Sequence, residues 1–221
     1  MSPGPLMRTH IHRMTRHMDD MRMTQAPSSA SQIKILPGTR KTGRSALVIN
    51  IFGGPGSGKS TLAADLFSEL KKHHVEAACP EEHAKLAIWS GQPWLLDQQT
   101  ILLGRTWETL HALQDKVDVI IVDSPILLCS VYAREHEPVC FHQLTADLHR
   151  RTDRVNLLLE RDPTLSYSTN GRRENEREAM IVDEQILTTL DIHNEPYCEI
   201  SRTRKDIEHI ATSVVEYLHR T

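Results

Sequence analysis

The chain has 221 residues, of which 39% are hydrophobic and 25% are charged, and its formal net charge is −3. These values are typical of one α/β core with an appended tail. No apolar run approaches the about 20 residues that a membrane span requires, so insertion into a membrane is not expected. The four cysteines form no C-x-x-C pair, which disfavours a zinc site and a disulfide framework and favours a cytoplasmic location.

Residues 1–44 differ in composition from the rest of the chain. They hold eight basic and two acidic residues, a charge of +6, and six of the seven methionines, whereas the remaining 177 residues carry −9. Residues that disfavour regular structure, such as Pro37 and Gly38, interrupt the segment. We therefore expect a mobile N-terminal extension at 1–44 and one domain at 45–221.

One pattern leaves the role of the extension open. Its apolar residues follow a four-three spacing that would form a stripe on a basic amphipathic helix: Met7, Ile11, Met14, Met18 and Met21. Such a helix could bind nucleic acid, an acidic partner or a membrane surface, and an Arg-rich start also resembles an organellar import segment. The alternative is a dispensable extension, or a true start at one of the internal methionines.

The first element of the domain is an apolar run at 46–52, which predicts a buried strand. It leads directly into a G-x-x-x-x-G-K-[ST] pattern made of Gly53, Gly54, Pro55, Gly56, Ser57, Gly58, Lys59, Ser60 and Thr61. This pattern is the phosphate-binding P-loop, and the apolar spacing over 60–72 supplies the helix that should follow it.

The chemistry of the P-loop comes from its glycines and from two side chains. Glycine permits the backbone conformations in which successive N–H groups turn inward around a phosphate. Lys59 is expected to contact the β- and γ-phosphates and Ser60 to bind Mg²⁺. The sequence therefore predicts ATP and Mg²⁺ as cofactors.

From residue 45 onward, strand-like and helical patterns alternate. This alternation predicts an α/β domain of the P-loop NTPase fold, a five-stranded parallel sheet with helices on both faces. The expected strands are 46–52, 75–79, 117–123, 155–159 and 197–200. The expected helices are 60–72, 84–88, 95–113, 138–151, 174–190 and 207–218.

Four apolar residues at 119–122 are followed by Asp123, which makes a Walker B-like element. In a parallel sheet the carboxyl end of this strand opens beside the P-loop. Asp123 is therefore expected to bind Mg²⁺ with Ser60, or to accept the proton of the acceptor hydroxyl. A turn residue without a catalytic role is the alternative.

The segment after the strand at 155–159 is rich in arginine: Arg161, Arg172, Arg173 and Arg177. Phosphoryl transfer spreads charge over the γ-phosphoryl oxygens, so a closing loop that carries arginines would stabilise it. We predict a lid here with Arg172, directly after Asn170-Gly171, as its catalytic residue. Alternatively, these arginines pair with neighbouring glutamates on an exposed helix start, which we favour for Arg177.

Glu82 follows the expected strand 75–79 and is the candidate that orients or deprotonates the acceptor hydroxyl. Glu81 could replace it, and an acid favoured by the helix dipole is the alternative for both. One or two aromatic residues near the expected acceptor cleft could stack on a base, although most are expected to pack in the core. They are Trp89, Trp94, Trp107, Tyr132 and Phe141.

Taken together, four stretches resemble the small P-loop kinases of tailed phages, a group similar to thymidylate kinases and ribosylnicotinamide kinases. They are residues 50–60, Glu82-His83-Ala84-Lys85, the run 117–125 and Asn170-Gly171-Arg172. The resemblance covers 46–218 and implies a kinase. It includes the phage enzymes that phosphorylate 5-hydroxymethyluracil in DNA during thymidine hypermodification.

The resemblance implies an alcohol-group phosphotransferase whose acceptor is modified DNA, acting in the host cytoplasm if the protein is viral. The basic extension would suit DNA, since it could bind phosphates that the acidic domain repels. Asp123-Ser124-Pro125 stands where deoxynucleoside kinases have Asp-Arg-Ser, which makes a free deoxynucleoside less favoured. The alternatives are a thymidylate, nucleoside or ribosylnicotinamide kinase, and an ATPase switch subunit.

Overall fold

The computed structural model describes residues 33–39, 45–162 and 175–220. Within them five strands form one sheet in the order β2-β3-β1-β4-β5, and every strand pairing is parallel. The strands are β1 (Leu47–Phe52), β2 (Ala77–Ala78), β3 (Val119–Val122), β4 (Arg154–Leu159) and β5 (Cys198–Ile200). The predicted five-stranded parallel sheet is confirmed.

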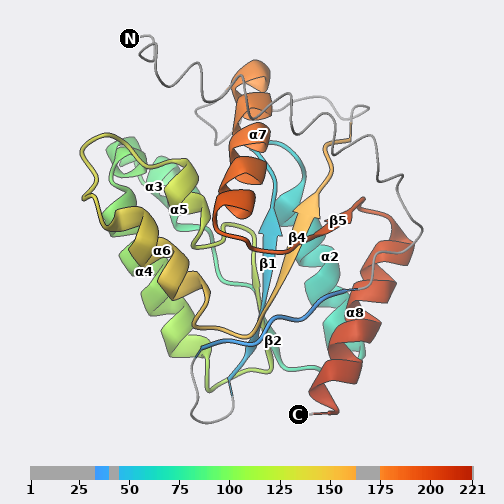
Figure 1. Cartoon of the computed structure of the whole chain (residues 1–221). Helices are drawn as coiled ribbons and strands as arrows, with labels where there is room; N and C mark the ends of the chain where they lie inside the picture. The colour runs from blue at the N-terminus through green and yellow to red at the C-terminus, as the bar shows by residue number, and fades with distance from the viewer. Residues whose placement is uncertain (1–32, 40–44, 163–174, 221) are drawn as a thin grey trace. The chain divides into compact units, whose positions relative to one another are not determined.

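Helices cover both faces of this sheet (Figure 1). On one face, α2 (Lys59–Lys72) and α8 (Arg204–Leu218) contribute buried residues to a shared core with the strands. The opposite face is covered by α4 (Gln99–Leu113), α5 (Leu128–Val131), α6 (Phe141–His149) and α7 (Glu176–Ile192). None of the described helices is long and apolar enough to cross a bilayer.

β1 occupies the centre of the sheet, between β3 and β4. All six of its residues are buried, because successive side chains point to opposite faces and each face carries helices. Leu47, Ile49 and Ile51 belong to the core under α2 and α8. The loop after Phe52 therefore starts from the most firmly held strand of the sheet.

Three elements differ from the prediction. The strand expected at 75–79 is reduced to Ala77–Ala78, since an edge strand has only β3 to pair with. The helix expected at 95–113 begins at Gln99, and the preceding residues form a 3₁₀ turn, η1 (Pro93–Asp97). The sequence pattern missed α5, whose four residues are too few to show helical periodicity.

Residues 33–39, which we placed in the mobile extension, pack against the domain. Leu36 exchanges two backbone hydrogen bonds with Arg154, of 2.8 and 2.9 Å, and Ile33 and Ile35 contact the core beneath α2 and α8. This stretch of the predicted extension thus packs with the domain, because its apolar side chains find a site beside β4. Residues 1–32 and 40–44 lie outside the described residues, and the boundary between 44 and 45 stays a prediction.

A buried charged cluster lies where α6, β4 and the loop before β5 meet. Glu195 is 4% exposed; it accepts hydrogen bonds from Arg154 Nη2 at 2.8 Å and from Arg150 Nε at 2.8 Å. His149 Nε2 lies 3.6 Å from the same carboxylate. Burial raises the pKa of Glu195, but His149 and Arg154 lower it by a larger amount, so the pKa falls to about 2. Burial lowers the pKa of His149.

This cluster predicts a loss of stability in acid. The unfolded chain takes up a proton at His149 near pH 6.5 and at Glu195 near pH 4.3, about the ordinary values, whereas the folded chain takes them up only at lower pH. The unfolding free energy should therefore fall as the pH drops below about 6.5, and fall further between about 4.3 and 2.

Denaturant unfolding of His149→Gln between pH 7.5 and 5 tests the first step. The unfolding free energy of the variant should fall less steeply with falling pH than that of wild type. The difference in slope should reach up to about 1.4 kcal/mol per pH unit, the value for uptake of one proton. Exposed His209→Gln is the matched control. Equal pH profiles for His149→Gln and wild type would contradict the prediction.

Candidate active site

The P-loop takes the backbone conformations that its glycines allow. Gly53, Gly56 and Gly58 have φ angles of 149°, 79° and 101°, which other residues rarely adopt. A Cβ on Gly53 would lie 2.7 Å from the hydroxyl oxygen of Ser57. A Cβ on Gly58 would lie 2.7 Å from Nη1 of Arg202, which follows β5. The backbone conformation therefore favours glycine at these three positions.

The loop ends at the first turn of α2, and this end of the helix is open to an anion. Gly58 is the N-cap residue, no side chain caps the helix, and no acidic residue lies in its first turn. The N–H groups and the helix dipole therefore favour negative charge at this point. Lys59 Nζ donates to the carbonyl oxygens of Gly53 at 2.7 Å and Gly54 at 3.0 Å, so its ammonium group lies inside the loop.

Ser60 and Asp123 meet, as the sequence predicted for a metal pair. Ser60 Oγ donates to Asp123 Oδ2 at 2.7 Å, although 63 residues separate them. Asp123 is 9% exposed. Among the described residues no three His, Cys, Asp or Glu are grouped to hold a metal. Mg²⁺ in phosphoryl-transfer sites needs only one or two protein oxygens, because substrate phosphates and water complete its shell. The two oxygens therefore fit Mg²⁺.

A cavity of about 270 Å³ adjoins the P-loop on the side of α3 (His83–Trp89), α4 and α5. We call it the P-loop cavity. Lys59, Ser60 and Thr61 form one end of it, and Glu82 lies in its wall. The rest is mixed apolar and polar, including Ile88, Leu96, Gln99, Leu102, Thr106, Leu128, Tyr132 and Arg134.

The structure separates the two candidate glutamates. Glu82 is the N-cap residue of α3, yet its side chain makes no capping hydrogen bond, and it lines the P-loop cavity. Glu81 lines a smaller hollow of about 20 Å³ that Glu82 and Asp123 share. Of the two glutamates, only Glu82 adjoins both spaces, while the catalytic role of either residue stays a prediction.

Only part of the predicted lid lies within the described residues. Arg172 and Arg173 lie outside the described residues, so the prediction for Arg172 stays a prediction. Arg177 lies exposed on the first turn of α7. Arg161, which follows β4, donates from Nε to Asp183 Oδ2 at 2.9 Å and from Nη2 to Pro55 O at 3.0 Å. Among the described arginines of the segment after β4, Arg161 is the one that contacts the P-loop.

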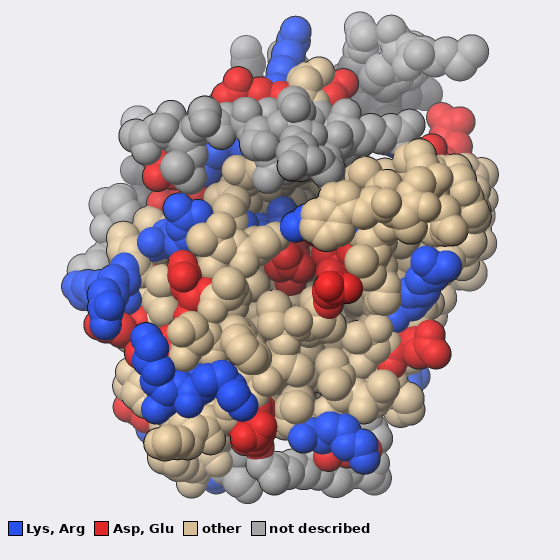
Figure 2. Space-filling view, turned by 180° about the vertical axis from the view of Figure 1, so that it is seen from behind, with Lys and Arg blue, Asp and Glu red and all other residues tan. Residues whose placement is uncertain are grey.

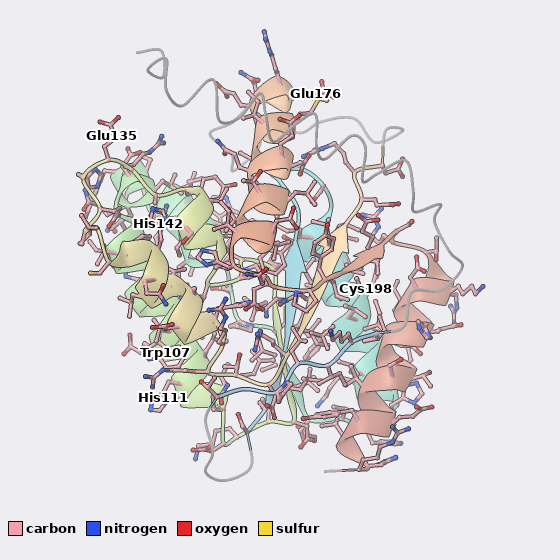
Figure 3. The ribbon with its side chains drawn as sticks, in the orientation of Figure 1. Trp107, His111, Glu135, His142, Glu176 and Cys198 are labelled. Atoms are coloured by element: carbon pink, nitrogen blue, oxygen red, sulfur yellow. The ribbon has the colours of Figure 1, made fainter. Side chains whose placement is uncertain are left out.

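The aromatic candidates divide between the cavity, the core and the surface. Tyr132 lines the P-loop cavity, whereas Trp107 and Phe141 pack in the core beside α4. Trp107 also stacks on His111 with ring centroids 6.2 Å apart, toward the end of α4 far from the carboxyl ends of the strands (Figure 3). Trp89 and Trp94 are more than half exposed.

Asp183 contacts the P-loop, although the sequence pattern did not single it out. Its Oδ1 accepts a 2.6 Å hydrogen bond from the backbone N–H of Gly54, inside the P-loop. A signal was present, because Asp183 lies between Ala179, Val182 and Ile186 on the buried side of α7, where an acid requires a partner. The pattern could not identify that partner, which lies 129 residues away.

Comparison with known proteins identifies the family of the chain. The family model AAA_28, an AAA domain, matches residues 48–208. No curated protein sequence matches the chain.

Solved structures resemble it in fold. A NadR protein in complex with NAD and AMP-PNP has a TM-score of 0.56 at 16% identity, over 79% of this chain and 50% of that one. A NadR protein in complex with NR has a TM-score of 0.53 at 15% identity, over 78% and 51%. This chain thus spans about half the length of those two chains. A deoxyadenosine kinase from M. mycoides, with dCMP and dCDP bound, has a TM-score of 0.47 at 15% identity, over 79% and 100%.

The Ser60 and Asp123 pair predicts how metal and nucleotide binding are coupled. Asp123→Asn removes the negative charge and should weaken the Mg²⁺-dependent part of ATP binding by about 10- to 100-fold. Titration of ATP with and without Mg²⁺ measures this, with the exposed Asp115→Asn as control. An unchanged Mg²⁺ response in Asp123→Asn would show that Asp123 is only a turn residue.

Proposed function

The chain belongs to the AAA_28 family of AAA domains, and from this premise we propose that it is an ATP- and Mg²⁺-dependent kinase that phosphorylates a hydroxyl group. The P-loop binds the phosphates of ATP, and a second substrate binds in the P-loop cavity. We further propose that this acceptor is a free small molecule of the nucleoside or nucleotide class.

The observation that carries the proposal is the continuity of the P-loop cavity. One space of about 270 Å³ is bounded by Lys59, Ser60 and Thr61 at one end and by a carboxylate, Glu82, in its wall. A kinase needs a place for its acceptor within reach of the γ-phosphate. A switch or motor subunit needs the phosphate site but no second ligand cavity beside it, so the arrangement favours a kinase.

Each residue has a role in this reaction. Lys59 and the N-terminus of α2 stabilise the charge that develops on the transferring phosphoryl group. Ser60 and Asp123 hold Mg²⁺, which neutralises phosphate charge when bound. Glu82 orients the acceptor hydroxyl and accepts its proton, and Arg161, or Arg172 from the predicted lid, adds a cation from the side of α7.

The size and lining of the P-loop cavity support a small acceptor. Binding sites for one small ligand start at about 300 Å³ and combine apolar walls with a few polar groups. The P-loop cavity, at about 270 Å³, lies at the small end of this range and has such a mixed lining. A base flipped out of DNA could also enter such a cavity, but DNA would need further contacts to its phosphates. On the face shown in Figure 2, acidic side chains of the described residues lie among the basic ones.

Transfer of label from γ-labelled ATP tests the proposal. Nucleosides, nucleotides, ribosylnicotinamide and DNA that contains 5-hydroxymethyluracil are assayed in parallel with the full chain. We expect label on a small molecule. Label on the DNA alone would instead support the acceptor that the phage-kinase resemblance implies, and hydrolysis without any labelled acceptor would favour the ATPase switch.

Removal of the carboxylate in the cavity wall should affect transfer and not ATP binding. Glu82→Gln should lower kcat by about 10² to 10⁴-fold, the range for loss of a general base, with little change in the KM for ATP. Glu81→Gln, which alters the smaller hollow, should retain most of the activity. The opposite ranking would assign the role to Glu81.

Filling the cavity should separate the two substrates. Thr106 lies in the cavity wall, so Thr106→Trp should block the acceptor while ATP still binds the P-loop. Acceptor KM and ATP Kd are the readouts, and Thr212→Trp on the exposed side of α8 is the control. Equal losses of acceptor and ATP binding would contradict a separate acceptor site.

A further inference from the structure

One peptide unit of the P-loop is held from both sides. The carbonyl oxygen of Gly53 accepts a 2.7 Å hydrogen bond from Lys59 Nζ. The N–H of Gly54, which belongs to the same peptide unit, donates a 2.6 Å hydrogen bond to Asp183 Oδ1. In a planar trans peptide the C=O and N–H point in opposite directions. Lys59 and Asp183 therefore fix the same plane from opposite sides.

The fit at this peptide leaves no room for a side chain. A Cβ on Gly54 would lie 2.5 Å from Asp183 Oδ1 and 2.7 Å from the backbone oxygen of Ala179. Gly54, the second glycine of the P-loop, thus lies directly against α7. Figure 1 shows α7 beside this loop, which follows β1. Rotation of the Gly53–Gly54 peptide would break the contact with Asp183 and the contact with Lys59 together.

The second oxygen of Asp183 extends the contact to another part of the loop. Asp183 Oδ2 accepts from Arg161 Nε at 2.9 Å and lies 2.8 Å from Arg161 Nη2. Arg161 Nη2 in turn donates to the carbonyl oxygen of Pro55 at 3.0 Å. One carboxylate therefore orders Gly54 directly and orders Pro55 through the guanidinium group of Arg161, whose Nε and Nη2 both face Asp183 Oδ2.

The formation of α7 does not require Asp183. The helix buries Ala179, Val182, Ile186 and Leu190, and its N-terminus carries a complete capping box between Asn175 and Glu178. The side chain of Asp183 is 31% exposed, so its charge is not wholly buried. Its hydrogen bonds are directed at the P-loop and at Arg161, and they add nothing to the helix itself.

We propose that Asp183 is a positioning residue of the ATP site: it fixes the Gly53–Gly54 peptide that holds Lys59 and orients Arg161 toward the P-loop. Asp183 acts through these groups and does not touch the substrates. This inference rests on the proposed function, because it assigns Asp183 to the site that binds the phosphate donor.

A double-mutant cycle tests the coupling to Lys59. The Kd for ATP with Mg²⁺ is measured for wild type, Asp183→Ala, Lys59→Ala and the double variant, with exposed Glu184→Gln as the control on the same helix. Asp183→Ala should weaken ATP binding by about tenfold or more and lower turnover by up to about 10²-fold, as misplacement of a charged group does. In the Lys59→Ala background the same substitution should cost clearly less, because only its effect through Arg161 remains.

Asp183→Asn is the second variant, because its amide oxygen can still accept from Gly54. The amide nitrogen cannot accept from Arg161, so we expect its ATP affinity to lie between those of wild type and Asp183→Ala. The unfolding midpoints of both variants should stay close to that of Glu184→Gln. Additive losses in the cycle, or an equal loss in Asp183→Asn and Asp183→Ala, would overturn the inference.

The cycle also separates this inference from the proposed function. ATP binding with the predicted coupling, but without transfer to any acceptor, would retain the role of Asp183 and reject the kinase. Transfer to an acceptor with wild-type ATP affinity in Asp183→Ala would retain the kinase and reject the role of Asp183. A wild-type chain that binds no ATP would overturn both.

Discussion

The parallel pairing of β1 with β3 on one side and β4 on the other is the constraint on which the site depends. In register, Asn50 lies beside Val122 and Phe52 beside Leu158. Because parallel strands end at the same edge of a sheet, the residues after these strands converge although they are far apart in the chain. Asp123 therefore reaches Ser60, and Arg161 reaches the P-loop.

The convergence divides the site into two sides. On the β3 side, α3, α4 and α5 enclose the P-loop cavity with Glu82 in its wall. On the β4 side, Arg161 and Asp183 contact the N-terminal part of the P-loop, and Arg202 after β5 lies against Gly58. A central P-loop with a cavity on one side and arginine side chains on the other is compatible with the proposed transfer between two bound substrates.

The P-loop is ordered by contacts from outside the motif as well as by its own glycines. Lys59 donates to the carbonyl oxygens of Gly53 and Gly54, and Arg161 donates to that of Pro55. Asp183 accepts from the N–H of Gly54. Groups ordered before the substrate binds need no reorganisation during the reaction, which is the main source of electrostatic stabilisation in enzymes. The buried cluster around Glu195 likewise orders a segment from outside: Arg154 binds Glu195 through its side chain and Leu36 through its backbone.

The sequence by itself determined the P-loop, the five parallel strands, most of the helices and the carboxylate that meets Ser60. Those features depend on local spacing, such as apolar runs, helical periodicity and glycine positions, which neighbouring residues encode. Only the tertiary structure decided that Glu82 rather than Glu81 faces the cavity, that residues 33–39 join the domain, and that Asp183 binds Gly54. Each depends on contacts between residues distant in the chain, which local spacing cannot predict. The partner of a carboxylate on a helix is determined only when the helix packs against the rest of the fold.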